Sequence, residues 1–151
     1  MGMKLKLKTL ANRLEPKILK KGLLRFWRKE KLSFPGNKKG SLASQIAFIL
    51  SNEIIPLIDY GIDFHTGGRM LSNYPQIRVD YKDKKGLELA TAFGTHYILN
   101  SPHIDKSFRK EAYKRRKHIL VYEGGESMRL DEYAVEEALL GTQRMLIHLG
   151  M

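Results

Sequence analysis

The apolar residues of the chain change their spacing several times after residue 40, and these changes predict alternating helices and strands. Ser41 can cap a helix whose apolar residues recur at helical spacing as far as Ile54, with Pro56 closing it. Short apolar runs then predict strands, and a return to helical spacing predicts helices. The expected strands are Ile58 to His65, Gln76 to Val79, His96 to Leu99 and Ile119 to Glu123, and the further helices are Leu87 to Phe93 and Lys106 to Arg116.

A last helix is expected to open at Asp131 and Glu132, because acidic residues are favoured in a first helical turn, and to stop at Gly150. Strands that alternate with helices indicate an α/β fold. We therefore expect three layers, with a mixed, largely parallel sheet and helices on both faces. The predicted buried face of the last helix consists of Val135, Ala138, Leu139, Met145, Leu146 and Leu149.

Two of the predicted strands end on a polar side chain followed by a pair of glycines. One run ends at His65, just before Gly67 and Gly68, and another ends at Glu123, just before Gly124 and Gly125. In open α/β sheets, sites lie at the carboxyl ends of strands. A neutral imidazole is a zinc ligand, and a carboxylate can take a proton from water. A single strand-end histidine is more often a hydrogen-bonded structural residue, so this pattern alone leaves both interpretations open.

Composition limits the chemistry that such a site can use. The chain has 151 residues, of which 42% are hydrophobic and 28% charged, which is ordinary for one globular domain. It has no cysteine, so any metal ligand must be His, Asp or Glu. No apolar stretch approaches the roughly 20 residues of a membrane span, and no secretory signal is evident. We expect a cytoplasmic protein.

Positive charge is concentrated in the first 33 residues, which we interpret as a basic segment separate from the domain at 34–151. These residues carry eleven Lys or Arg and two Glu, a net charge of +9, which leaves +2 of the total +11 for the remaining 118. A basic arm of this kind, residues 4–31, can bind nucleic acid or anionic lipid through phosphate contacts. The alternative is a lysine-rich face that is simply solvated.

Several motifs, taken in order along residues 33–151, resemble those of the succinylglutamate desuccinylase/aspartoacylase family of zinc-dependent deacylases, which are related to the zinc carboxypeptidases. The resemblance implies a catalytic domain with the carboxypeptidase-like α/β fold. The motifs are Phe-Pro-Gly-Asn at 34–37, Gly-Ser-Leu-Ala at 40–43, Asp-Phe-His-Thr-Gly at 63–67, Asn-Tyr-Pro-Gln-Ile-Arg at 73–78, Ala-Phe-Gly at 92–94, Leu-Val-Tyr-Glu-Gly-Gly-Glu at 120–126 and Leu-Gly-Met at 149–151.

The resemblance also implies roles for individual residues. His65 matches the third zinc ligand of the family, with Phe64 where the family has Leu, and Glu123 matches the glutamate that acts as general base and acid. Arg69, Asn73 and Arg78 stand where polar or cationic groups could bind the carboxylate of a small N-acyl amino acid substrate. Arg78 is equally compatible with a structural ion pair.

The sequence departs from the family pattern upstream of residue 34. The first two zinc ligands of the family form a His-x-x-Glu motif there, whereas the first histidine of this chain is His65. Lys29 to Leu32 replaces the Asp-Leu-Asn-Arg run that binds substrate. The small β-rich C-terminal domain of the family would begin about where Met151 lies. Because one imidazole cannot retain zinc, we expect an incomplete, truncated catalytic domain that is inactive as an isolated monomer.

Two classes of function therefore remain open. The first is a zinc-dependent deacylase present as an incomplete fragment; in that case another chain could supply the missing ligands. The second is a non-catalytic binding module that uses the basic arm for nucleic acid, anionic lipid or a protein partner. A sheet without its N-terminal strands would also leave an edge strand that favours homo-oligomers.

Overall fold

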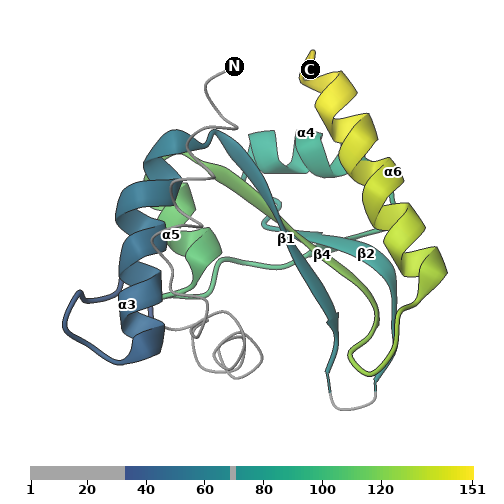
Figure 1. The fold of residues 1–151 in the computed structure, drawn as a ribbon. Coiled ribbons are helices and arrows are strands. Elements are labelled where there is room, and N and C mark those ends of the chain that lie inside the picture. Colours follow the sequence, from purple (N-terminus) through teal and green to yellow (C-terminus); the bar gives the residue numbers. More distant parts are fainter. Residues whose placement is uncertain (1–32, 69–70) are drawn as a thin grey trace.

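The computed structural model describes residues 33–68 and 71–151, which form a four-stranded sheet between two groups of helices (Figure 1). None of the helices in these two ranges is both long and apolar enough to cross a bilayer. The basic segment and Arg69 lie outside the described residues. In chain order the elements are α3 (Leu42–Ile49), η2 (Leu50–Ile54), η3 (Ile55–Leu57), β1 (Tyr60–Gly67), β2 (Asn73–Val79), α4 (Lys84–Phe93), β3 (Tyr97–Asn100), α5 (Phe108–Lys114), β4 (His118–Glu126) and α6 (Glu132–His148).

The first helical stretch begins where the sequence predicts but changes geometry before it ends. The Ser41 side chain accepts a hydrogen bond from the Ser44 amide, which satisfies an amide of the first turn of α3. The chain then passes through the π-helical turn η2 and the 3₁₀ turn η3. Pro56 lies inside the last turn, not after it, because a 3₁₀ turn tolerates a proline at its start. The extended segment that follows starts two residues later than predicted, at Tyr60.

The remaining helices are confirmed, with boundaries fixed by caps. The side chains of Asp83, Ser107 and Asp131 each accept a hydrogen bond from an amide in the first turn of α4, α5 and α6, respectively. Gly94 ends α4 in the left-handed conformation at φ 78°, a backbone geometry that glycine adopts without strain. α5 is shorter than predicted, because Arg116 has a positive φ and leaves the helix.

The sheet is mixed, as expected, and its strand order is β1-β4-β2-β3. β1 runs parallel to β4 and β2 runs parallel to β3, while β2 and β4 are antiparallel to each other. Pro75 lies within β2, where its missing amide would break a regular ladder. The register between β2 and β4 shifts between Asn73 and Gln76, and this irregularity accommodates the proline.

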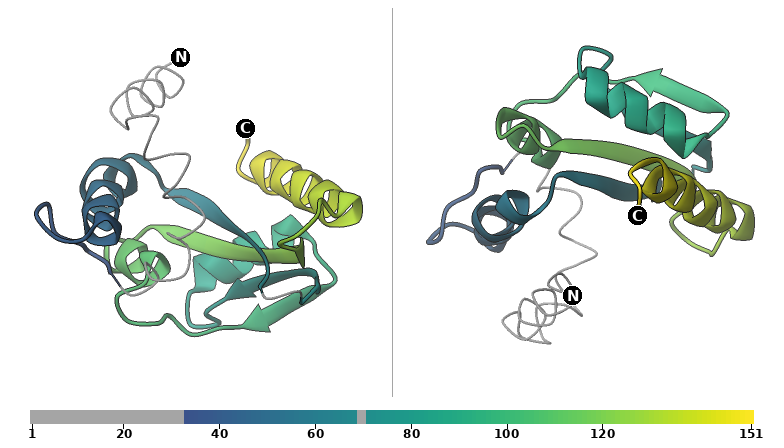
Figure 2. Two further views of the ribbon diagram at one scale, coloured as in Figure 1. Left: turned by 60° about the horizontal axis from the view of Figure 1, so that its bottom comes forward. Right: turned by 90° about the horizontal axis from the view of Figure 1, so that it is seen from above.

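Helices pack on both faces of the sheet, which confirms the three-layer architecture (Figures 1 and 2). On one face, the buried side chains of β2 and β4 pack with α4 and α6 in the larger core, which contains Phe93, Leu120 and Met145. On the other face, Ile55, Ala112 and Ile119 form a smaller core beneath η3 and α5. Because side chains alternate along a strand, each strand contributes every second residue to each face.

The predicted buried face of α6 is partly wrong. Met145 is buried, and Ala138 and Leu149 pack against the larger core, as expected. The other three predicted residues are exposed, and the small residues Ala134 and Gly141 are buried instead. A β-carbon at Gly141 would lie 2.0 Å from the Phe93 ring, so α6 approaches α4 through its small residues. The exposed residues are Val135, Leu139 and Leu146.

Candidate active site

His65 and Glu123 lie side by side on adjacent parallel strands. They are register partners in the β1–β4 ladder, and His65 Nδ1 is 3.8 Å from Glu123 Oε1. The two carboxyl ends meet at one edge of the sheet because β1 and β4 are parallel (Figure 1). The structure therefore brings together the two residues that the sequence singled out. Their roles as zinc ligand and general base remain predictions.

Asp63 is a third member of this group, and the sequence analysis did not assign it a role. Its Oδ2 lies 3.0 Å from His65 Nε2. Residues i and i+2 of a strand point to the same face, so the Asp-x-His spacing was the signal that could have identified it. Both ring nitrogens of His65 thus face a carboxylate, one from its own strand and one from β4.

Asn73 and Arg78, the two predicted substrate-binding residues that the structure describes, both contact Glu123. Asn73 Nδ2 donates a hydrogen bond of 2.9 Å to Glu123 Oε2, and Arg78 Nη1 lies 3.6 Å from Glu123 Oε1. The Glu123 side chain is only 9% exposed, whereas Arg78 is 38% exposed. The carboxylate is therefore held by an amide on one oxygen, with a looser cationic contact on the other.

Glycines bring the backbone close to this end of the sheet. A β-carbon at Gly67 would lie 1.9 Å from the Leu71 carbonyl oxygen, so no side chain fits where the chain turns out of β1. Gly125 has φ 67°, a conformation that side-chain-bearing residues adopt only with strain. One glycine of each pair seen in the sequence, Gly67 and Gly125, thus permits a backbone geometry that a side chain would prevent or strain near the ends of β1 and β4.

The described residues do not fit a catalytic zinc. Such a site needs three protein ligands and an open position. No group of three or more His, Asp or Glu side chains in residues 33–68 and 71–151 is arranged to hold a metal ion. His65 stands between the carboxylates of Asp63 and Glu123. Zinc binding would require ligands that this part of the chain does not supply.

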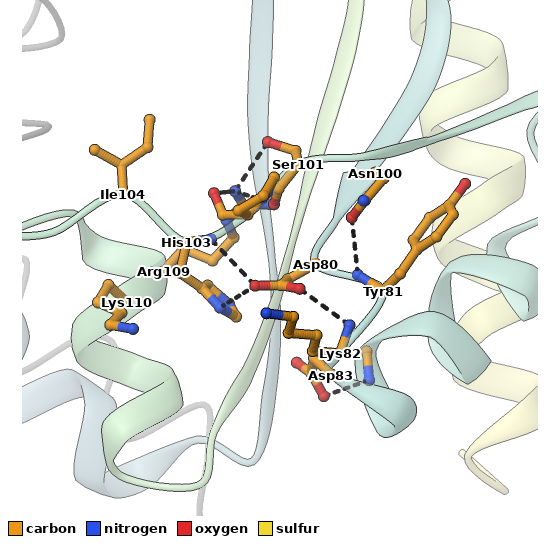
Figure 3. A network of polar contacts seen from close by, with 12 residues as sticks. Asp80, Tyr81, Lys82, Asp83, Asn100, Ser101, His103, Ile104, Arg109 and Lys110 are labelled. Carbon is orange, nitrogen blue, oxygen red and sulfur yellow. Dashed lines mark hydrogen bonds and ion pairs between the residues drawn. The ribbon is translucent and has the colours of Figure 1, made fainter.

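A second polar cluster lies at the opposite end of β2 and joins three elements (Figure 3). We call it the Asp80 network. Asp80 Oδ1 accepts from the Lys82 amide at 3.0 Å, and Asp80 Oδ2 accepts from the His103 amide at 3.3 Å and lies 3.2 Å from His103 Nδ1. Arg109 of α5 donates to the carbonyl oxygens of Arg78, Ser101 and Pro102 and to the Ser101 hydroxyl.

Burial and hydrogen bonding shift the titration of this network. The Lys82 amide, followed by the His103 amide and imidazole, holds the pKa of Asp80 below its usual value against an opposing effect of burial. Burial lowers the pKa of His103, and the nearby Arg109 guanidinium lowers it further. The His103 ring also stacks on Tyr113, with centroids 4.5 Å apart. The pattern favours a neutral His103 beside an ionised Asp80.

Arg78 connects the two polar clusters. Its carbonyl oxygen accepts a hydrogen bond of 3.2 Å from Arg109, and its guanidinium approaches Glu123. Since both groups belong to one residue of β2, the Asp80 network helps to fix the strand position from which Arg78 reaches the candidate site. Sequence spacing does not reveal this link, because it depends on the packing of α5.

A family model for the succinylglutamate desuccinylase/aspartoacylase catalytic domain matches residues 31–149. The chain belongs to this family. A curated relative, the N-alpha-acetyl-L-2,4-diaminobutyric acid deacetylase of Halomonas elongata, is 30% identical over an alignment of 128 residues, and the match covers 79% of this chain and 37% of the relative. The chain therefore spans less than two fifths of the length of that relative.

Solved structures show the same fold. A succinylglutamate desuccinylase/aspartoacylase from Rhodobacter sphaeroides superposes with a TM-score of 0.73 at 25% identity, covering 82% of this chain and 38% of that one. The product-bound ectoine utilisation protein EutE (DoeB) of Ruegeria pomeroyi gives a TM-score of 0.72 at 23% identity, covering 80% and 39%. The chain thus corresponds to less than two fifths of the length of each of these proteins.

Proposed function

We propose that this chain carries the histidine–glutamate part of the active site of a zinc-dependent N-acyl amino acid deacylase, and that it does not catalyse hydrolysis alone. The observation that carries the proposal is the contact between His65 and Glu123 at the paired carboxyl ends of β1 and β4. Family membership supports an amide hydrolase acting on N-acylated amino acids.

Glu123 is the proton carrier of the proposed site. A general base must lie within hydrogen-bond reach of the water that attacks the amide, and the same carboxyl group can then protonate the departing amine. Asn73 holds Oε2 at 2.9 Å, which leaves Oε1 turned toward His65 and Arg78. This fixed orientation suits a carboxylate that exchanges a proton with water on its second oxygen.

Arg78 is the described residue best placed to bind an anionic substrate group. Its guanidinium is more than one third exposed and only loosely paired with Glu123, so a substrate carboxylate can approach it. The planar guanidinium offers two parallel donors to a carboxylate. Arg69 precedes β2 in the chain and lies outside the described residues, so its part in substrate binding remains a prediction.

Catalytic zinc is the component that this chain does not complete. The only histidine among the candidate residues is His65, and no His-x-x-Glu pair precedes it in the 151 residues. One imidazole with neighbouring carboxylates does not reproduce the three-ligand set of a catalytic zinc site. We therefore expect the isolated chain to bind less than one zinc ion per molecule and to leave N-acyl amino acids intact.

Elemental analysis of the purified full chain tests this proposal directly, together with assays on N-acetyl-2,4-diaminobutyrate and N-succinylglutamate. We expect substoichiometric zinc and no hydrolysis, both unaffected by His65→Ala. The matched control is His96→Ala, which removes an exposed histidine that contacts Tyr74, away from Glu123. One zinc ion per chain, lost in His65→Ala but retained in His96→Ala, would contradict the proposal.

A complementing chain would give a different result in the same assay. A polypeptide bearing the His-x-x-Glu motif would restore one zinc ion and hydrolysis only in the mixture. Both gains would disappear with His65→Ala, and hydrolysis alone would disappear with Glu123→Gln. This outcome would assign the two residues their predicted roles while confirming that the isolated chain is incomplete.

A further inference from the structure

Strand register arranges the side chains of one sheet face into two rows that cross all four strands. Ile77, Ile98 and Tyr122 pack in the larger core, so their neighbours along β2, β3 and β4 point to the opposite face of the sheet. The candidate site is therefore one end of a longer surface. The register partners define a first row of His65, Glu123, Gln76 and Tyr97 and a second row of Asp63, Val121, Arg78 and Leu99.

The chemistry of these rows changes from ionisable to apolar between β1 and β3. The β1 and β4 ends carry the histidine and the carboxylates of the candidate site, and β2 contributes the amide of Gln76 and the guanidinium of Arg78. The β3 end carries Tyr97 and Leu99, which are 55% and 41% exposed. Ligand sites commonly combine a few polar groups with apolar walls. These two rows offer both on one face.

The Tyr97 ring is held in place by a second ring. It makes an edge-to-face contact with Tyr74 at a centroid distance of 5.5 Å, and the Tyr74 hydroxyl lies 3.0 Å from the Tyr133 hydroxyl. Aromatic rings attract each other in this arrangement. Because the contact restricts the Tyr97 ring and still leaves it exposed, a ligand that packs on the ring costs little further side-chain freedom.

The spacing across the rows suits an acylated amino acid. Adjacent strands lie about 4.8 Å apart, so the backbone of β3 is roughly 10 Å from that of β4. A ligand whose amide lies over Glu123 and whose carboxylate binds Arg78 would extend its side chain toward β3. The Arg78 side chain is 38% exposed and stands 3.6 Å from the Glu123 carboxylate, so its guanidinium keeps donors for such a ligand.

We propose that Tyr97 and Leu99 form the subsite for the side chain of the substrate's amino acid, and that this side chain is aromatic or aliphatic. The inference rests on the proposed function, because it takes the positions of the reacting amide and the carboxylate from Glu123 and Arg78. Val121, the register partner of Arg78 on β4, adds an apolar side chain to the same face. An aromatic side chain would bury apolar surface there, whereas a polar side chain of similar length would not.

Ligand binding to the full chain tests this subsite without requiring hydrolysis. N-acetyl-L-phenylalanine and N-acetyl-L-glutamine share their acyl group, backbone amide, carboxylate and net charge, so they differ in the side chain alone. Their dissociation constants are measured by NMR titration of the isotope-labelled protein. We expect N-acetyl-L-phenylalanine to bind on the order of tenfold more tightly and to shift the amide resonances of β3.

Two kinds of variant locate this preference. Tyr97→Ala and Leu99→Ala should each reduce it by a factor of about three or more, because each removes apolar surface from the subsite. The matched control is Leu139→Ala, which removes an exposed leucine of α6, a helix that packs on the opposite face of the sheet, and it should keep the full preference. Arg78→Gln should weaken both ligands by a similar factor, on the order of tenfold, because they share the carboxylate.

The outcomes separate this subsite from the proposed function. Equal affinities for the two ligands, both weakened by Arg78→Gln, would overturn the subsite and leave the proposed carboxylate site intact. A preference that persists in both Tyr97→Ala and Leu99→Ala would also overturn it. Binding of neither ligand, or binding that does not depend on Arg78, would overturn the subsite together with the proposed role of Arg78. The zinc and complementation experiments test the roles of His65 and Glu123 independently.

Discussion

The carboxylates of Glu123 and Asp80 lie near opposite ends of β2 with side chains 9% and 12% exposed, and they are held in different ways. Asp80 receives two backbone amides and lies 3.2 Å from an imidazole, within a network that Arg109 closes with four hydrogen bonds. Glu123 receives one amide hydrogen bond, from Asn73, while the Arg78 guanidinium and the His65 imidazole stand at 3.6 and 3.8 Å. The polar groups of the first cluster are held by direct hydrogen bonds, whereas Glu123 is held by one hydrogen bond and two longer contacts.

This difference teaches how to separate a structural cluster from a candidate site in one small domain. A buried polar network that is fully hydrogen-bonded rigidifies the fold, and removing a member leaves buried partners unsatisfied. A site that must bind and release other molecules keeps part of its hydrogen-bonding capacity unused. Within residues 33–68 and 71–151, no hydrogen-bond partner is found for the buried Arg78 Nε atom, which fits the second description.

Arg109→Ala should produce the largest loss of stability. The substitution removes four hydrogen bonds and leaves the carbonyls of Arg78, Ser101 and Pro102 without their donor in a largely buried position. We expect the free energy of unfolding to fall by about 3 kcal/mol, measured by urea denaturation at pH 7.

The control for this change lies on the same helix. Lys114→Ala removes an exposed cation whose contact with Glu111 is 3.9 Å long, and it should cost no more than about 0.5 kcal/mol. If Arg109→Ala and Lys114→Ala lowered the free energy of unfolding equally, the effect would come from removing any cation of α5 and not from the Asp80 network.

His103→Gln should change how stability depends on pH. Burial lowers the pKa of His103 in the folded state, so the unfolded chain takes up the proton more readily as pH falls. Folding stability is therefore present above the usual histidine pKa of about 6.5 and is lost as pH falls below it. Glutamine cannot titrate, so the variant should show a flatter decline in unfolding free energy between pH 7 and 5.

Asp80 contributes to folding stability in a different pH range, so its contribution can be separated from that of His103. Its folded pKa is held below the usual aspartate value, so the stability that it provides persists above about pH 4 and is lost only in stronger acid. Urea titrations of wild type, His103→Gln and the exposed-site control His96→Gln at pH 7, 6 and 5 measure the histidine component alone. If the unfolding free energy of His103→Gln declined with pH as steeply as that of wild type, His103 would not be the source of the decline.

The candidate site was easier to predict from sequence than the Asp80 network. His65 and Glu123 each end an apolar run, and the ends of parallel strands meet, so the strand pattern alone indicated their proximity. Asp63 could also have been predicted, because residues two apart in a strand point to the same face and Asp63 precedes His65 by two. The Asp80 network instead joins the end of β2, the segment after β3 and helix α5, and no local spacing reports that these three converge.

The error on α6 has a similar physical origin. Helical periodicity identified apolar residues on this helix, but it could not tell which apolar flank faces the sheet. Close packing of Gly141 against Phe93 turns the small residues inward and leaves Leu139 and its neighbours exposed. Apolar residues on an amphipathic helix can thus lie outside the core that the helix covers.

Glu123→Gln should produce the smallest change in stability, despite the burial of this residue. Glutamine keeps the shape and retains an oxygen that can accept from Asn73, while the lost charge was paired only through the longer contacts to Arg78 and His65. Asp80→Asn is the matched acid-to-amide change in the network. The Asp80 oxygens accept from two backbone amides and approach His103. We therefore expect Asp80→Asn to lower the free energy of unfolding by about 2 kcal/mol and Glu123→Gln to lower it by no more than about 0.5 kcal/mol. Urea denaturation of both variants at pH 7 measures the difference, and equal costs would make Glu123 as structural as Asp80.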